Sequence, residues 1–446
     1  MTLAFKFLIL KKYISMEMFR LAEITLAFGR EKLKFNLASK HFWEVLKPKD
    51  FVANQSPEDL ISRSLNNPIH SIPFDQIFRA NHKTLIVVPD KTRNCGAQVF
   101  LPILIERLNR SGVTDSDIKI MLANGSHTSH TTAEIEKIVG PKILDRIEIV
   151  EHDSKNSNEL TFLGTTKFEI PIFINRQVLA ADFVMVASAV LHHYFAGYGG
   201  GPKMINPGCA GYETITKNHA LTIDSENGTM HPRCRAGVLE GNPVQEDIED
   251  SMRFVKVDFL FETILNEQGE IAKVVCGDLV RAHKEACEIV DAHYKIPIHE
   301  KAELVVVSCG GFPKDINFIQ AHKSIQNAFQ AVKEGGVILV LAECEQGVGS
   351  DTFLDWFNYP DESSFRGALA NNFTLNATTA LSLKMKTRAV KIVLVSTLPE
   401  NLVVKLAMLP AADLDEGWKI AGKLLSDNFK CFVIPNGSLT LPQLIS

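Results

Sequence analysis

Short runs of apolar, mostly β-branched residues recur along the chain, separated by stretches with helical spacing. They cover residues 84–89, 118–123, 146–150 and 183–187, and later residues 303–308, 336–341, 391–396 and 431–435. Continuous apolar runs of this length are typical of strands that are buried on both faces of a parallel sheet. Between the first two runs, residues 99–108 carry a helical pattern. The alternation predicts α/β architecture with largely parallel sheets.

The two sets of apolar runs predict two domains. A chain of 446 residues is longer than one typical hydrophobic core requires. A helical stretch at residues 280–294, followed by Pro297, separates the two sets. We therefore expect an N-terminal α/β domain at residues 16–278 and a C-terminal α/β domain at residues 279–446.

The first 15 residues do not fit either domain. Their short apolar run precedes Lys11 and Lys12, whereas a secretory signal carries its positive charge first and has a longer apolar stretch. Met16 and Met18 follow at once, and both are possible start residues alongside Met1. We interpret residues 1–15 as a disordered or spurious extension.

Composition restricts the class of function. The formal net charge is -5 and the pI is about 6.3. A nucleic-acid-binding protein would need a clustered excess of basic residues, which nothing here indicates. No apolar run approaches the length of a membrane span, so no membrane association is expected. The eight cysteines are scattered without a C-x-x-C pair, which indicates reduced thiols in a cytoplasmic protein.

Polar and glycine-rich segments follow several predicted strands. These segments are residues 90–93, 124–127, 188–203 and 310–314. Ligands of open α/β sheets bind beyond the carboxyl ends of the strands. Since the segments come from both predicted domains, we expect them to meet at an active site in an interdomain cleft.

The densest of these segments is residues 192–203, with the sequence HHYFAGYGGGPK. Its glycines expose N–H groups to anions, and Lys203 indicates a phosphate or a carboxylate. A P-loop is excluded because Pro202 precedes the lysine and Met204 follows it. Glycine density alone leaves open a structural turn with a solvated lysine.

Three histidines are candidates for chemistry. His127, His193 and His219 lie at separations that match no helical zinc motif. Taken singly, each is more often a hydrogen-bonded structural residue than a ligand. A functional role is indicated only by their combination with the other motifs.

Taken together, the motifs resemble the nickel-dependent lactate racemase family over nearly the whole chain from Met16. The matching elements occur in the family's order. They are Asp-x-x-Arg at Asp90 and Arg93, Gly-x-His at Gly125 and His127, the loop from His193 to Tyr198 with Lys203, Asn-His at Asn218 and His219, and Gln-x-x-Lys at Gln320 and Lys323.

The resemblance implies a nickel pincer nucleotide as cofactor, attached to Lys203 through a thioamide. His219 would be the one protein ligand of nickel, because the pincer supplies the other donors and imidazole suits this metal. The residues implied to bind the cofactor besides Lys203 are Asp90, Gly199, Gly200 and Gly201. Cofactor-synthesis enzymes would be needed as activating partners.

The resemblance also implies the reaction, which is racemisation or epimerisation of a small-molecule 2-hydroxy acid by reversible hydride transfer. His127 and His193 would be an acid/base pair on opposite faces of the substrate, since histidine titrates near working pH. Arg93, Gln320 and Lys323 would bind the substrate, and an arginine can hold its carboxylate with two hydrogen bonds.

Two alternative functions stay open, and the sequence differs from the resembled family at one informative place. A hydrolase could use the three histidines as ligands of one metal ion, and a non-catalytic carrier could bind a nucleotide through the glycine-rich loop. Lactate-specific members of the resembled family often carry a tryptophan over the cofactor, where this chain has residues 376–379, NATT. This departure predicts a more open substrate pocket, so the substrate need not be lactate.

Overall fold

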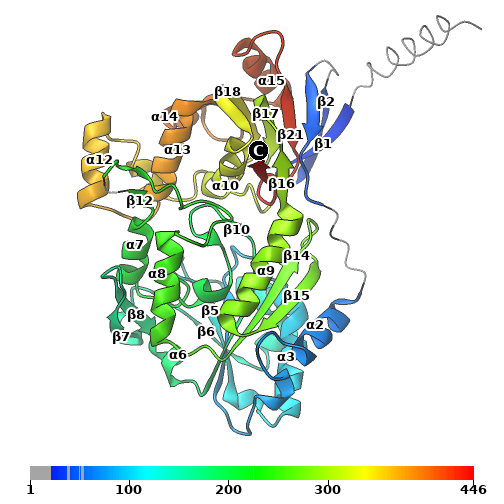
Figure 1. Ribbon diagram of the computed structural model, residues 1–446, viewed down its shortest axis with the longest axis vertical. Coiled ribbons are helices and arrows are strands. Elements are labelled where there is room, and N and C mark those ends of the chain that lie inside the picture. The colour runs from blue at the N-terminus through cyan, green and yellow to red at the C-terminus, as the bar shows by residue number, and fades with distance from the viewer. Residues whose placement is uncertain (1–21, 38–40, 50, 52–54, 225, 446) are drawn as a thin grey trace, which may run out of the picture. The chain divides into compact units, whose positions relative to one another are not determined.

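The computed structural model describes residues 22–37, 41–49, 51, 55–224 and 226–445 (Figure 1). The predicted extension at residues 1–15 lies outside this part of the chain. The described residues form two compact units. Unit 1 contains the described residues up to Pro48, Tyr294–Asn372 and the residues from Asn376 onward, and unit 2 contains Lys49–His293 and Phe373–Leu375.

Unit 2 is built on a six-stranded sheet with the order β15-β14-β9-β4-β5-β6. Its strands are β4 (Thr84–Pro89), β5 (Ile118–Ala123), β6 (Glu148–Glu151), β9 (Phe183–Ala189), β14 (Phe259–Leu265) and β15 (Ile271–Gly277). All neighbours are parallel except β14 and β15. Every residue of β4 is buried, which explains its uninterrupted apolar run. The four strands predicted for this half are confirmed.

Unit 1 holds a second six-stranded sheet with the order β20-β19-β18-β17-β21-β3, in which all neighbours are parallel. Its strands are β3 (Phe42–Val45), β17 (Ala302–Ser308), β18 (Val332–Leu341), β19 (Lys391–Val395), β20 (Leu409–Ala411) and β21 (Cys431–Ile434). The four predicted strands of the second set are among them, so the predicted α/β class with largely parallel sheets is confirmed.

Helices and short hairpins complete each unit. Unit 2 contains α2 (Pro57–Asn66), α3 (Ala97–Arg110), α4 (Thr132–Val139), α5 (Pro141–Leu144), α6 (Arg176–Ala180), α7 (Tyr212–Ala220), α8 (Pro243–Ser251), nearly all of α9 (Leu279–Tyr294), and the strand pairs β7 (Leu160–Thr165) with β8 (Pro171–Asn175), β10 (His192–His193) with β11 (Gly197–Tyr198), and β12 (Ile223–Asp224) with β13 (Thr229–Met230). Unit 1 adds α10 (Phe318–Phe329), α11 (Asp351–Asp355), α12 (Glu362–Asn371), α13 (Ala377–Ala389), α14 (Glu400–Lys405), α15 (Leu414–Lys423), and the pairs β1 (Ala22–Phe28) with β2 (Glu31–Leu37) and β16 (Lys295–Ile298) with β22 (Leu441–Leu444).

The units differ from the expected domains 16–278 and 279–446 at both ends. Strand β3 pairs with β21, so the start of the chain completes the sheet of unit 1. The hairpin of β1 and β2 buries Leu26, Phe35 and Leu37 in the same core. Helix α9 belongs to unit 2 through His293. The local sequence of an edge strand does not show which sheet it joins when its partner strand is far away in the sequence.

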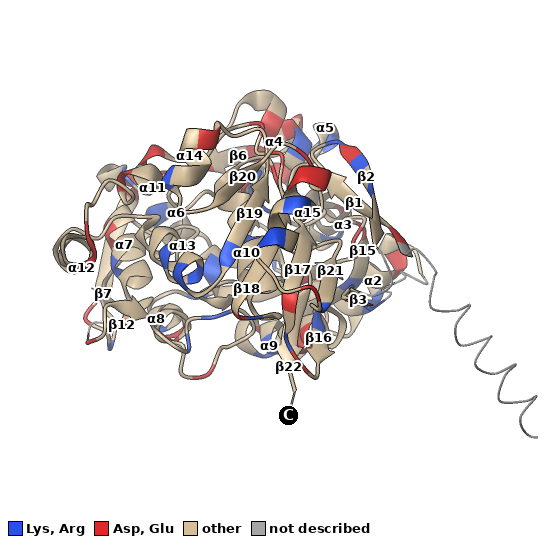
Figure 2. Cartoon of the chain, turned by 90° about the horizontal axis from the view of Figure 1, so that it is seen from above, with Lys and Arg blue, Asp and Glu red and all other residues tan. Residues whose placement is uncertain are grey.

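Figure 2 shows lysines and arginines interspersed with aspartates and glutamates over the side that the view presents. All eight cysteines are buried and unpaired. None of the helices in the described residues combines the length and the apolar character needed to cross a bilayer.

Candidate active site

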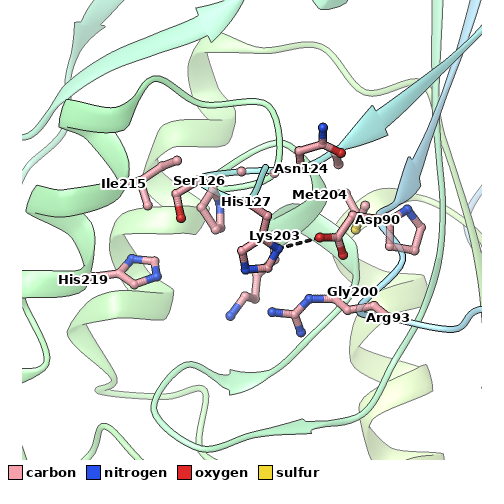
Figure 3. A pocket seen from close by; sticks show the side chains of 15 residues that line it. Asp90, Arg93, Asn124, Ser126, His127, Gly200, Lys203, Met204, Ile215 and His219 are labelled. Carbon is pink, nitrogen blue, oxygen red and sulfur yellow. Dashed lines mark hydrogen bonds and ion pairs between the residues drawn. The ribbon is translucent and has the colours of Figure 1, made fainter. Parts of the chain in front are cut away.

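A pocket in unit 2 lies where the loops after β4 and β5 meet the segment after β9 and helix α7. Figure 3 shows its side chains. The pocket is lined by Pro89, Asp90, Arg93, Ala123, Asn124, Gly125, Ser126, His127, Gly200, Lys203, Met204, Pro207, Gly208, Ile215 and His219. Six residues singled out from the sequence are therefore brought together: Asp90, Arg93, His127, Gly200, Lys203 and His219.

Asp90 and His127 form a hydrogen-bonded pair at the carboxyl ends of adjacent strands. His127 Nδ1 lies 2.5 Å from Asp90 Oδ2, while Thr92 Oγ1 donates to Asp90 Oδ1 at 2.7 Å. Burial disfavours the charged carboxylate, but the hydrogen bond and charge of His127, with help from Thr92 and Arg93, outweigh it and lower the pKa of Asp90 to about 2. An ionised carboxylate only accepts, so the proton of neutral His127 lies on Nδ1 and Nε2 is left as an acceptor.

Arg93 stands one turn after Asp90, and its backbone N–H donates to the Asp90 carbonyl at 3.1 Å. Its guanidinium is close to the glycine-rich loop, because a Cβ at Gly199 would lie 3.6 Å from Arg93 Nη1. The side chain is exposed and faces the pocket (Figure 3). It can therefore present its planar fork to an anionic ligand.

Lys203 is buried in a short 3-10 helix (Gly201–Met204) that ends the glycine-rich segment. In Figure 3 its side chain lies between those of His219 and Arg93. Gly200 and Gly201 have φ values of +83° and +51°, in the left-handed region. A Cβ at Gly200 would lie 2.2 Å from Glu262 Oε1, and one at Gly201 would lie 2.5 Å from the His283 ring. Glycine is thus required at both positions, because the Glu262 and His283 side chains leave no space for a Cβ atom.

His219 lies in the last turn of α7 and lines the pocket opposite Arg93 in Figure 3. Burial, followed by the charge of Lys203, lowers its pKa to about 3, so the ring is neutral at physiological pH. Its Nδ1 is buried with no hydrogen bond of standard geometry, although the backbone of Ile215, one turn earlier in α7, interacts with the ring. A buried imidazole that stays neutral has the chemistry of a metal ligand. Its neighbour Asn218 anchors α7, since Asn218 Nδ2 donates to Asp247 Oδ2 in α8 at 2.8 Å.

His193 is near this pocket but is not among its lining residues. The N–H of Ala196 donates to His193 Nδ1 at 3.3 Å, so neutral His193 carries its proton on Nε2. Phe195 links it to the pocket. The Phe195 ring contacts the His193 ring at 4.5 Å and the His219 ring at 5.0 Å, and Lys203 Nζ lies 5.4 Å from its centre.

The remaining predicted residues are less directly placed. Gly199 and Gly201 belong to the glycine-rich loop without lining the pocket. Gln320 and Lys323 stand one turn apart on α10 in unit 1, where Lys323 Nζ donates to Gln320 Oε1 at 2.6 Å. Their meeting with the pocket of unit 2, and the expected interdomain cleft, stay predictions.

Sequence reasoning missed three residues that hold the site together. Phe195 was recognised only as one position of the family's loop motif, although its ring contacts two candidate histidines and Lys203. Asn242 caps α8 and donates to the Phe195 carbonyl at 2.8 Å, and the Asn-Pro start of that helix is a recognisable signal. Glu262 accepts the N–H of Gly201 at 2.6 Å from within a strand, where no local pattern marks it.

The three candidate histidines do not form one metal centre. In the part of the chain that the structure describes, no three or more His, Cys, Asp or Glu side chains are grouped so that they could hold a metal ion. The hydrolase alternative, which needs such a group, loses its structural basis.

Comparison with protein families gives two matches that together span most of the chain. The family model of the lactate racemase N-terminal domain matches residues 28–231, and that of the lactate racemase C-terminal domain matches residues 298–441.

Individual relatives agree with these matches. A lactate racemase from Thermoanaerobacterium thermosaccharolyticum is 28% identical over 425 residues, which is 94% of this chain and 98% of that protein. A lactate racemase from Lactiplantibacillus plantarum is 31% identical over 298 residues, 67% of this chain and 69% of that protein. The solved structure of the lactate racemase apoprotein from T. thermosaccharolyticum superimposes with a TM-score of 0.85 at 28% identity, covering 95% of this chain and all of the other. A Thermotoga maritima protein at 18% identity, with a TM-score of 0.59 over 87% of this chain and 98% of the other, shares the fold.

Proposed function

The chain belongs to the lactate racemase family, and on this premise we propose that it is a racemase or epimerase of a 2-hydroxy acid. The observation that carries the proposal is the pocket itself. It combines a carboxylate-oriented histidine, an exposed arginine, a buried lysine and a neutral, buried histidine (Asp90 with His127, Arg93, Lys203 and His219). These residue types could respectively move a proton, bind a carboxylate, attach a cofactor and coordinate a metal ion.

The pocket residues fit the nickel pincer nucleotide. Lys203 would hold it covalently, and His219 would donate a ring nitrogen to nickel. The fit rests on the buried His219 ring, which lines the same pocket as Lys203 and whose low pKa keeps it free of a competing proton. When bound, the cofactor supplies reversible acceptance of the α-hydrogen of the substrate as hydride.

The chain's own residues would do the proton chemistry. Asp90 fixes the tautomer of His127, so Nε2 can accept the substrate hydroxyl proton, and the ionised carboxylate stabilises the imidazolium that forms. His193 is the proposed partner for the opposite enantiomer. In neutral form its Nε2 carries a proton, so the two rings start in complementary states, one able to accept and the other to donate.

Arg93 would bind the substrate carboxylate bidentately and so fix the α-carbon in the pocket. Gln320 and Lys323 are proposed to contact the same substrate from unit 1. Lactate is one candidate substrate, and because residues 376–379 read NATT, without a tryptophan, other 2-hydroxy acids are candidates too. We further propose a cytoplasmic location and dependence on cofactor-synthesis enzymes.

The proposal is tested by producing the chain together with the enzymes that make the cofactor and supplying pure enantiomers of lactate, malate, phenyllactate and sugar acids. Chiral chromatography should show the opposite enantiomer or epimer of at least one substrate, and a Lys203→Ala variant prepared in parallel should be inactive. Nickel-loaded protein that converts none of these acids would contradict a racemase and favour the nucleotide-carrier alternative.

A further inference from the structure

One face of α9 contacts the segment that carries His193 and Lys203 at two separate points. The polar residues of this face are His283, Cys287 and Asp291, which follow one another at intervals of one helical turn. The first two are buried, and the third is partly buried. Polar groups at such positions are costly unless they have partners, so the partners define what the face does.

The first contact point is Asp291. Tyr198 donates its hydroxyl to Asp291 Oδ1 at 2.6 Å, and His192 Nε2 lies 2.8 Å from the same oxygen. His192 and Tyr198 face each other across the antiparallel pair of β10 and β11. One carboxylate therefore clamps both strands of the hairpin that carries His193. Burial, together with Asp291, raises the pKa of Tyr198, so the phenol stays a donor.

The second contact point is His283. Its Nδ1 lies 2.8 Å from Glu262 Oε2, and the other oxygen of Glu262 accepts the N–H of Gly201 at 2.6 Å. Ser188 also donates to that oxygen, at 3.1 Å. The His283 and Glu262 side chains are both almost fully buried. The turn that leads into Lys203 is thereby fixed to α9 through a buried hydrogen-bonded pair, two residues before the lysine.

We propose that α9 positions the segment from His192 to Lys203, with Asp291 and His283 as positioning residues for the reaction. His192, which adjoins the proposed acid/base His193, is on this view an anchor of the hairpin. The inference rests on the proposed function for its catalytic consequence, whereas its structural content does not. The residues of α9 need not touch substrate or cofactor.

The test is hydrogen–deuterium exchange of the full chain, read by mass spectrometry on peptides covering residues 192–201. Asp291→Ala should speed exchange of this segment by roughly ten- to a hundredfold, the loss expected for hydrogen bonds to a charged group. Peptides from β5 should not change. Glu285→Ala is the matched control, because it removes an exposed acidic side chain from the same helix.

A second variant guards against global unfolding. Asp291→Asn keeps the volume and one acceptor oxygen, so a smaller increase, confined to the same segment, is expected. In cofactor-loaded protein, Asp291→Ala should lower kcat with little change in KM, since Asp291 is proposed to act on His193 and not on the substrate. Unchanged exchange in both Asp291 variants would overturn the proposal. The exchange result does not depend on racemase activity, so failure of this inference is distinguishable from failure of the proposed function.

Discussion

Replacing Asp90 by asparagine probes the proposed proton chemistry with the smallest change in shape. Asp90 Oδ2 holds His127 Nδ1 at 2.5 Å, and Asp90 Oδ1 accepts from Thr92. Asparagine offers one oxygen and one amide group where two acceptors are needed, so one contact becomes mismatched. A hydrogen bond to a charged group contributes about 1.5–3 kcal/mol. Because each 1.4 kcal/mol is about tenfold in rate, kcat should fall roughly ten- to a hundredfold.

The assay is the initial rate from each pure enantiomer, followed by chiral chromatography on protein with measured nickel content. For a substrate with one stereocentre the two enantiomers are equally populated at equilibrium, so kcat/KM must fall by the same factor in both directions. Lys91→Ala is the control, because Lys91 neighbours Asp90 but pairs with Glu134 at the surface. An Asp90→Asn enzyme as fast as the control would refute the assigned role of the pair.

The same substitution has a signature in stability. Folding lowers the Asp90 pKa from its ordinary 3.8 to about 2, which corresponds to roughly 2 kcal/mol. A lowered pKa stabilises the folded state above the unfolded-state value, so this contribution is present above about pH 4 and is lost as the pH falls towards 2. Thermal unfolding between these pH values should therefore be less pH-dependent in Asp90→Asn, and identical profiles for both proteins would count against the ionised, buried carboxylate.

Three further substitutions test other parts of the pocket. Arg93→Lys keeps the charge but loses the bidentate fork, so kcat/KM should fall strongly at unchanged cofactor content, and normal kinetics would remove Arg93 from the site. His219→Ala should release nickel, measured by metal analysis, whereas His127→Ala should retain it; equal loss in both would contradict a single protein donor. Gly201→Ala places a methyl group on the His283 ring at positive φ and should lower stability by about 1–3 kcal/mol in denaturant unfolding, and a neutral effect would refute the packing argument.

Much of the candidate site could be predicted from the rule that ligands bind at the carboxyl ends of parallel strands. This rule placed Asp90 and His127 side by side from separate loops, since β4 and β5 are adjacent and parallel. The strands themselves were visible as apolar runs because both faces of each sheet are buried. The same rule placed the segment that contains Lys203 at this site, whereas His219 was assigned to it only through the family resemblance.

What the sequence did not reveal are the non-local supports of these residues. Glu262 is 61 residues from the Gly201 N–H that it accepts, and Asp291 is 99 residues from His192. Neither has a local signature, because a carboxylate that lies within a strand or helix is identified as a support only by its partner. The sequence suggested that Gly200 and Gly201 expose N–H groups to an anion. In the structure they are required because Glu262 and His283, which are distant in the sequence, leave no space for a side chain.

Attachment of the cofactor at Lys203 is proposed, and peptide mapping by mass spectrometry would locate the attachment site. Protein produced with the cofactor-synthesis enzymes should show an adduct on the peptide that contains Lys203, together with nickel, and Lys203→Ala should show neither adduct nor racemisation. An adduct that survives the substitution, or active enzyme whose Lys203 is unmodified, would contradict attachment at Lys203.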